Sequence, residues 1–124
     1  MRSSSIRSYR DLKVWQEGMN IAEACYQITK TFPREELYGM TSQIRRSAVS
    51  IPANIAEGYG REYRAEYIQF LRIAQGSLKE LETHLLLSVR VKLATNQVIL
   101  PILDRCESLG KMIRSLIRSL QNKT

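Results

Sequence analysis

The strongest constraint on the fold is a helical repeat of apolar residues that recurs in four separate stretches of the chain. Apolar residues return every three or four positions over residues 11–31, 35–58, 62–91 and 96–120, which is the spacing of one helix face. The predicted apolar face includes Tyr63 in the third stretch and Leu116 in the fourth. No segment alternates apolar and polar residues for long enough to predict a strand. Because only a few residues separate the stretches, consecutive helices should run antiparallel. We therefore predict an all-α, up-down-up-down antiparallel four-helix bundle.

Helix-capping residues and prolines refine these boundaries. Asp11 is a plausible N-cap of the first helix, and Gly58 with Gly60 should end the second. Pro52 lies inside the second apolar repeat, which continues in phase beyond it, so we expect a bend rather than a break. Pro101 should lie near the first turn of the fourth helix, which places the regular helix nearer Val98.

The first stretch carries more apolar surface than one helix contact needs. Its apolar positions cover nearly half of the circumference at 100° per residue. Either this helix is deeply buried within one chain, or its second flank packs against another subunit.

Length and composition indicate one ordinary globular domain. The 124 residues are 44% hydrophobic and 25% charged, which excludes wholesale disorder. No run of apolar residues is long enough to span a membrane, and the first residues lack the apolar core of a secretory signal. Two cysteines cannot form a disulfide framework, so we expect buried, reduced thiols and a cytoplasmic location. We expect a basic tail over residues 1–10, the bundle over 11–121 and a short tail over 122–124.

The formal charge of +7 comes entirely from the two ends of the chain. Residues 1–10 contribute three arginines and residues 108–124 contribute four basic residues, with no acid in either segment. Residues 11–107 hold 12 basic and 12 acidic residues and are neutral overall.

In the predicted topology both termini and the loop between the second and third helices lie at one end of the bundle. This end should gather a basic patch, and the exposed side of the third helix should carry a basic line that includes Arg61. Such cations neutralise phosphates and release counterions, so they are candidate nucleic-acid contacts. A solvated surface explains the same pattern, and Tyr59 and Tyr63 could stack on bases or cap the core. The candidate nucleic-acid-binding residues are Arg2, Arg7, Arg10, Arg61, Arg64, Arg72, Lys79, Arg90, Arg114 and Arg118.

Residue patterns that support catalysis are absent from the sequence. His84 is the single histidine, so a histidine metal site or proton relay has no partner in one chain. Cys25 and Cys106 lie on apolar faces, where small buried side chains are the usual occupants. Asn54 and Glu57 lie one turn apart beside Pro52 and are better suited to fixing helix packing, by bonds across to the first or third helix. We predict no catalytic residues, no metal and no cofactor.

Three segments carry a resemblance to a known family. They are DLKVW at residues 11–15, FPREELYGMT at 32–41 and QIRRSAVSIPANIAEG at 43–58. The chain resembles the four-helix-bundle family first named from open reading frames in intervening sequences of bacterial 23S ribosomal RNA genes, the S23 family. The residues that carry the family pattern, in a structural or interface role, are Trp15, Gln43, Arg46, Ser50, Pro52, Asn54, Glu57 and Gly58.

The resemblance implies a ring-shaped homopentamer without enzymatic activity. A similar family is the accessory protein of diversity-generating retroelements, a basic pentamer that binds nucleic acid and a reverse transcriptase. A subunit interface would account for the wide apolar sector of the first helix, and five copies of +7 would carry +35.

These observations lead to one function and one alternative. The first is a cytoplasmic, non-enzymatic homopentamer that binds nucleic acid, with structured RNA favoured, through phosphate contacts. The alternative is a protein-interaction scaffold that docks a partner such as a reverse transcriptase or a ribosome-associated factor.

Overall fold

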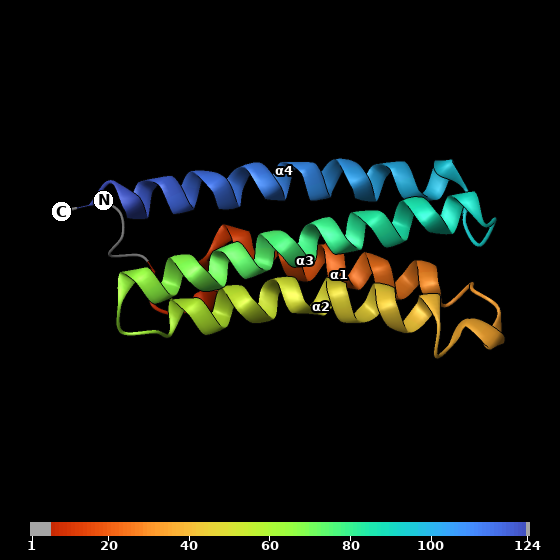
Figure 1. Ribbon diagram of the computed structural model, residues 1–124, viewed down its shortest axis with the longest axis horizontal. Coiled ribbons are helices and arrows are strands. Elements are labelled where there is room, and N and C mark those ends of the chain that lie inside the picture. The colour runs from red at the N-terminus through yellow and green to blue at the C-terminus, as the bar shows by residue number, and fades with distance from the viewer. Residues whose placement is uncertain (1–5, 124) are drawn as a thin grey trace.

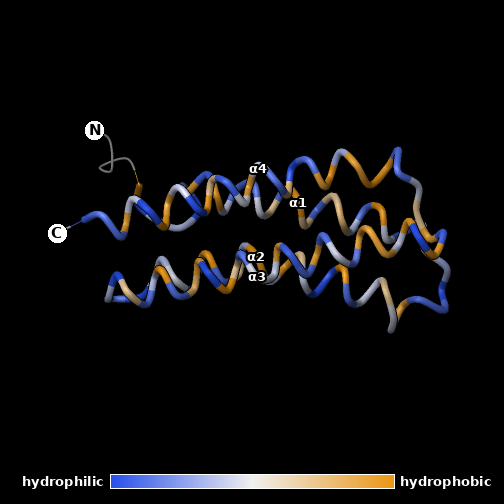
Figure 2. The backbone as a smooth tube through the Cα atoms, turned by 45° about the horizontal axis from the view of Figure 1, so that its top comes forward, coloured by the Kyte–Doolittle hydropathy of each residue, from blue (hydrophilic) through white to orange (hydrophobic). Residues whose placement is uncertain are grey.

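Four long helices form two layers, with α1 beside α4 in one and α2 beside α3 in the other (Figure 2). The computed structural model describes residues 6–123. The helices are α1 (Lys13–Thr29), α2 (Met40–Tyr59), α3 (Arg64–Arg90) and α4 (Asn96–Gln121), with short 3-10 helices η2 (Tyr9–Asp11) and η3 (Arg34–Glu36). The described residues contain no strand, which confirms the predicted all-helical class and the helix count.

Consecutive helices run in opposite directions, and α4 returns beside α1 (Figure 1). The start of α1, the end of α4 and the α2–α3 loop therefore lie at one end of the bundle, as predicted (Figure 1). The α1–α2 and α3–α4 loops lie at the other end. Because each helix packs against two neighbours, the side formed by α1 and α2 faces away from the side formed by α3 and α4.

The core is built from one buried face of each helix. Its largest fully buried side chains include Ile21 of α1, Ile51 of α2, Leu81 of α3 and Ile113 of α4. Along each helix, hydrophobic and hydrophilic residues alternate with the helical repeat, so one face is apolar (Figure 2). This repeat is what made the four helices predictable.

Two details of the predicted apolar faces were wrong. Tyr63 is 63% exposed, because it precedes α3 as its N-cap residue and does not join its apolar face. At the end of α4, Ile117 is buried, whereas the predicted Leu116 is only half-buried. Both positions lie at the edge of an apolar face, where sequence periodicity distinguishes neighbours poorly.

The helix starts differ from the predicted ones because local side chains form short turns first. Asp11 does not cap α1: its carboxylate accepts bonds from the backbone N–H groups of Arg7 (2.9 Å) and Ser8 (3.2 Å), closing η2. These bonds lower the pKa of Asp11 below its usual value. Similarly, the Glu36 carboxylate accepts the Met40 N–H at 3.0 Å, so α2 begins at Met40 and not near Glu35.

The predictions for the prolines and glycines were confirmed only in part. α2 continues through Pro52 without a break, and the bend itself stays a prediction. α4 begins at Asn96, the start of the predicted stretch 96–120, and only the shift toward Val98 that Pro101 suggested was wrong. Gly58 does not end α2: it is a buried position within the helix, which runs to Tyr59. Gly60 follows directly as the C-cap residue.

Both cysteines are buried and unpaired, as predicted. Burial raises the pKa of Cys25 and of Cys106 to about 12. Because the thiolate is the reactive form, both thiols should react with iodoacetamide at pH 8 about a thousandfold more slowly than in the unfolded chain. Mass spectrometry after timed labelling, with and without denaturant, checks this expectation. Rapid labelling of either thiol in the folded protein would contradict its burial.

Candidate nucleic-acid interface

The structure separates the ten predicted nucleic-acid contacts into cations with a partner inside the chain and cations without one. Arg2 lies outside the described residues. The other nine are all exposed. Their availability to a ligand depends on whether the charged group already contacts another part of the chain.

Arg61 and Arg64 are the clearest examples of cations that already contact other parts of the chain. The Arg61 guanidinium forms an ion pair with Glu57 at 2.9 Å, and its Cζ lies 4.9 Å from the centre of the Phe70 ring. Arg64 donates to the backbone carbonyls of Leu120, at 3.2 Å, and of Lys123. A cation at this position stabilises the C-terminal end of α4, where the helix dipole is negative. Both arginines therefore hold the end of the bundle together as well as adding charge to it.

The N-terminal cations are also partly offset. Asp11, held close by the Arg7 backbone, brings a carboxylate beside Arg7 and Arg10. The Arg10 guanidinium lies 5.6 Å from the centre of the Tyr9 ring. The basic end patch is therefore weaker than the sequence count suggests.

The predicted basic line along the third helix is shortened at its start. Arg61 precedes α3, so the line consists of Arg72, Lys79 and Arg90. Arg72 and Arg90 form no ion pair within the described residues. Lys79 contacts Glu82 at 3.2 Å, yet its side chain stays 74% exposed. An ion pair of such an exposed lysine stabilises the fold little, so a ligand could displace it at small cost.

A groove between α3 and α4 brings together cations from both helices. Its volume is about 560 Å³, and Lys79, Lys111 and Arg114 supply its basic side chains. We call this the basic groove. Leu78 and Cys106 form its apolar floor, Gly110 leaves space in its wall, and Gln75 and Glu107 complete the lining. Glu107 is the carboxylate in the lining, so cations dominate it by three to one.

The basic groove continues toward the end that holds the termini. Arg72 lies two turns before Lys79 on α3, and Arg118 lies one turn after Arg114 on α4. Because α3 and α4 are antiparallel, both arginines extend the row of cations in the same direction (Figure 1). The flank therefore carries a row of cations from both helices, with Glu82 and Glu107 among them.

Lys111 is the functional candidate that sequence reasoning missed. It was counted only as part of the charged C-terminal segment. The available signal was its position three residues before Arg114 and seven before Arg118, which places all three on one face of α4. Its place in the same groove as Lys79 could not be predicted from the sequence, because it depends on α3 packing beside α4.

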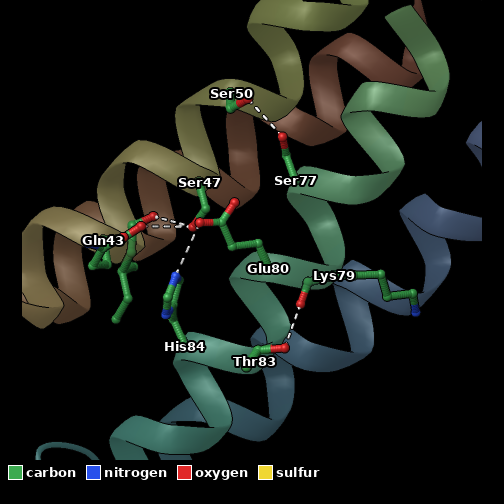
Figure 3. A network of polar contacts seen from close by, with 9 residues as sticks. Gln43, Ser47, Ser50, Ser77, Lys79, Glu80, Thr83 and His84 are labelled. Carbon is green, nitrogen blue, oxygen red and sulfur yellow. Dashed lines mark hydrogen bonds and ion pairs between the residues drawn. The ribbon is translucent and has the colours of Figure 1, made fainter. Parts of the chain in front are cut away.

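The predicted motif residues of α2 mostly serve helix packing. Ser50 and Ser77 share a hydrogen bond of 2.8 Å between α2 and α3 (Figure 3). The predicted bond from Asn54 to the first or third helix was wrong: its Nδ2 donates to the Ser50 carbonyl at 2.8 Å and to the Ser50 hydroxyl at 3.0 Å, both within α2. Glu57 contacts Arg61 in the loop that follows α2. The link to α3 is therefore made by Ser50, which Asn54 orients.

Other motif residues fix close contacts. Pro52 is buried, and a Cβ at Gly18 of α1 would lie 3.4 Å from its ring. Trp15 packs edge-on against Tyr9 with ring centres 5.3 Å apart. Gln43 and Arg46 are exposed. His84 lies at the edge of the core, 3.5 Å from the Glu80 carboxylate (Figure 3).

The described residues hold no cluster of three or more side chains that suits a metal ion. None of the helices in residues 6–123 combines the length and the apolar character that crossing a membrane requires. The fold and the groove together define a basic, antiparallel four-helix bundle.

Comparison with known proteins places this bundle in a family. Residues 10–115 match the family of 23S rRNA-intervening sequence proteins, and the chain belongs to that family. The chain is also similar to the crystal structure of a protein of unknown function from the S23 ribosomal protein family of Bacteroides thetaiotaomicron VPI-5482. The two share 28% identity with a TM-score of 0.75, over 84% of this chain and 97% of that chain. No curated protein matches the sequence.

Proposed function

We propose that this protein is a non-enzymatic, cytoplasmic homopentamer that binds structured RNA through phosphate contacts in the basic groove. The observation that carries the proposal is the convergence of Lys79, Lys111 and Arg114 on one groove between α3 and α4. Lys111 and Arg114 form no ion pair within residues 6–123, so their charges are available to a ligand. Contacts of this kind recognise the backbone and carry little base specificity.

Exposed apolar side chains support the assembly of several chains. Met19 of α1 is 45% exposed, and Leu86 and Leu87 of α3 are also exposed. A ring of five chains would repeat the basic groove five times around one particle. A field of that size attracts RNA with a strong dependence on salt. Sedimentation velocity tests the assembly, and a monomer would contradict it.

The experiment that tests RNA binding removes two groove cations. The double variant Lys111→Ala/Arg114→Ala should bind a structured 5′-hydroxyl RNA about tenfold more weakly at ~100 mM salt, since each lost phosphate contact reduces counterion release. Its slope of log affinity against log salt should be shallower by about 1 to 2. Filter binding between about 50 and 200 mM salt measures both quantities.

A matched variant separates the groove from net charge. Lys30→Ala/Arg34→Ala removes the same charge from exposed positions near the α1–α2 loop, at the other end of the bundle. It should leave both the affinity and the slope near those of the unchanged protein. Equal losses in the two double variants would assign binding to net charge and reject the groove. No RNA binding by the unchanged protein at low salt would reject the function.

The resemblance to retroelement accessory proteins, stated from the sequence, leads us to propose docking to a reverse transcriptase as the alternative function. A reverse transcriptase gene with template and variable repeats beside this gene would support docking to that enzyme. A gene within a ribosomal RNA locus would argue against that docking role.

A further inference from the structure

A second cationic hollow lies between α1 and α2, on the opposite side of the bundle from the basic groove. Its volume is about 360 Å³, and Tyr26, Arg45, Arg46, Val49 and Ser50 line it. We call it the α1–α2 hollow. Sequence reasoning assigned no ligand to it, although two of its residues, Arg46 and Ser50, belong to the family pattern. It contains two guanidinium groups, one aromatic ring and no carboxylate.

Arg45 is fixed in position by two contacts with α1. Its Nε donates to the Thr29 hydroxyl at 2.9 Å, and its Cζ lies 4.5 Å from the centre of the Tyr26 ring. The Thr29 hydroxyl is itself buried and donates to the Cys25 carbonyl at 2.7 Å. The terminal nitrogens of Arg45 form no hydrogen bond within the described residues. A guanidinium held in this way is oriented in advance to donate two parallel bonds to an oxyanion.

Arg46 adds a second cation to the hollow, and Ser50 lies beside it. Arg46 is exposed and forms neither an ion pair nor a hydrogen bond within residues 6–123. The Ser50 hydroxyl is positioned by Ser77 at 2.8 Å and by Asn54 at 3.0 Å. The hollow therefore presents two positive charges to one ligand. A phosphomonoester, with a charge of about −1.5 to −2 at neutral pH, matches them better than the single charge of a phosphodiester or a carboxylate.

The remaining wall suits a planar, partly apolar group. Tyr26 is 40% exposed and Val49 is 43% exposed, side by side with the two arginines. Bases stack on tyrosine rings and on guanidinium planes. We propose that the α1–α2 hollow binds a nucleoside monophosphate, with the phosphate on Arg45 and Arg46 and the base against Tyr26 and Val49. The ligand is either a free nucleotide or the phosphorylated end of an RNA.

Isothermal titration with AMP, inorganic phosphate and adenosine tests the proposal. AMP should bind more tightly than phosphate, and adenosine should bind most weakly. Arg46→Ala should weaken AMP binding about tenfold, the loss expected for one charge-assisted contact. Tyr26→Leu should remove the advantage of AMP over phosphate, because the base loses the ring against which it stacks. Lys111→Ala/Arg114→Ala removes two cations from the opposite side of the bundle, so it controls for net charge and should bind AMP normally.

Two RNAs of one sequence, with a 5′-phosphate or a 5′-hydroxyl, identify the source of the ligand. Preference for the phosphorylated RNA, lost in Arg46→Ala, would identify an RNA end. Equal RNA affinities together with AMP binding would identify a free nucleotide. The proposal is overturned if AMP does not bind, if Arg46→Ala binds AMP normally, or if a glutamate-rich peptide binds as tightly as AMP. The groove experiment uses 5′-hydroxyl RNA, so the two proposals succeed or fail separately.

Discussion

Replacing Gly58 with alanine is expected to destabilise the bundle by about 1–3 kcal/mol, the usual range for overpacking a filled interior. A Cβ at this position would lie 2.7 Å from the Cβ of Phe70 and 3.2 Å from the Tyr67 carbonyl oxygen of α3. Neither atom can rotate away, because both belong to or adjoin the α3 backbone. The two helices would have to separate at this contact. Urea denaturation followed by circular dichroism measures the change in the free energy of unfolding.

Gly76→Ala is the matched control, since it makes the same chemical change on an open helix surface. A Cβ at Gly76 would have no atom within 4 Å beyond its own helix neighbourhood, and the residue lies in the middle of α3. Alanine favours the helix over glycine by about 0.5–1 kcal/mol, so this variant should be more stable than the unchanged protein. If both variants shifted stability in the same direction, the close approach of α2 and α3 at Gly58 would be wrong.

Gly58 also illustrates what sequence periodicity could and could not predict. The apolar repeat located all four helices, because burial of one face imposes a spacing that a single sequence displays. It could not distinguish a glycine that ends a helix from one that permits a neighbouring helix to approach. That distinction depends on Phe70, a residue of the next helix. The predicted starts of the first two helices were wrong for a related reason: the Asp11 and Glu36 carboxylates accept backbone N–H bonds and form turns that a pattern of residue types does not specify.

The candidate interface was predicted in part for similar reasons. Topology correctly placed the start of α1, the end of α4 and the α2–α3 loop at one end, and periodicity identified the exposed cations of α3. Whether a given arginine is available depends on its neighbours in space. Arg64 donates a hydrogen bond to the Leu120 carbonyl at the end of α4, 56 residues away, and no local sequence pattern predicts that contact. Lys79 and Lys111 likewise line one groove only because α3 packs beside α4.

Shortening a buried side chain of α4 is expected to have the second large effect on the free energy of unfolding. It also tests whether α4 unfolds together with the other helices. Ile113→Ala is expected to destabilise the protein by about 2–5 kcal/mol, because the side chain is fully buried and the remaining cavity adds to the lost burial. Against a typical total of about 5–15 kcal/mol, such a loss would lower the midpoint of denaturation markedly. Urea denaturation measured separately by circular dichroism and by Cys106 labelling gives the comparison.

Leu116 offers the matched position on the same helix. It is half-buried and lines a notch of about 460 Å³ between α1 and α4 with Leu12, Val14 and Met112. Because part of its surface already contacts solvent, Leu116→Ala should cost about 1 kcal/mol or less, well below Ile113→Ala. The basic groove borders α4 on one side, and this notch borders it on the other. The buried face around Ile113 is therefore the main attachment of α4 to the other helices. If Ile113→Ala cost no more than Leu116→Ala, or if Cys106 became reactive before the helical signal was lost, α4 would dock as a separate, weakly held element. The basic groove could then open, and Lys79 would not be held opposite Lys111 and Arg114.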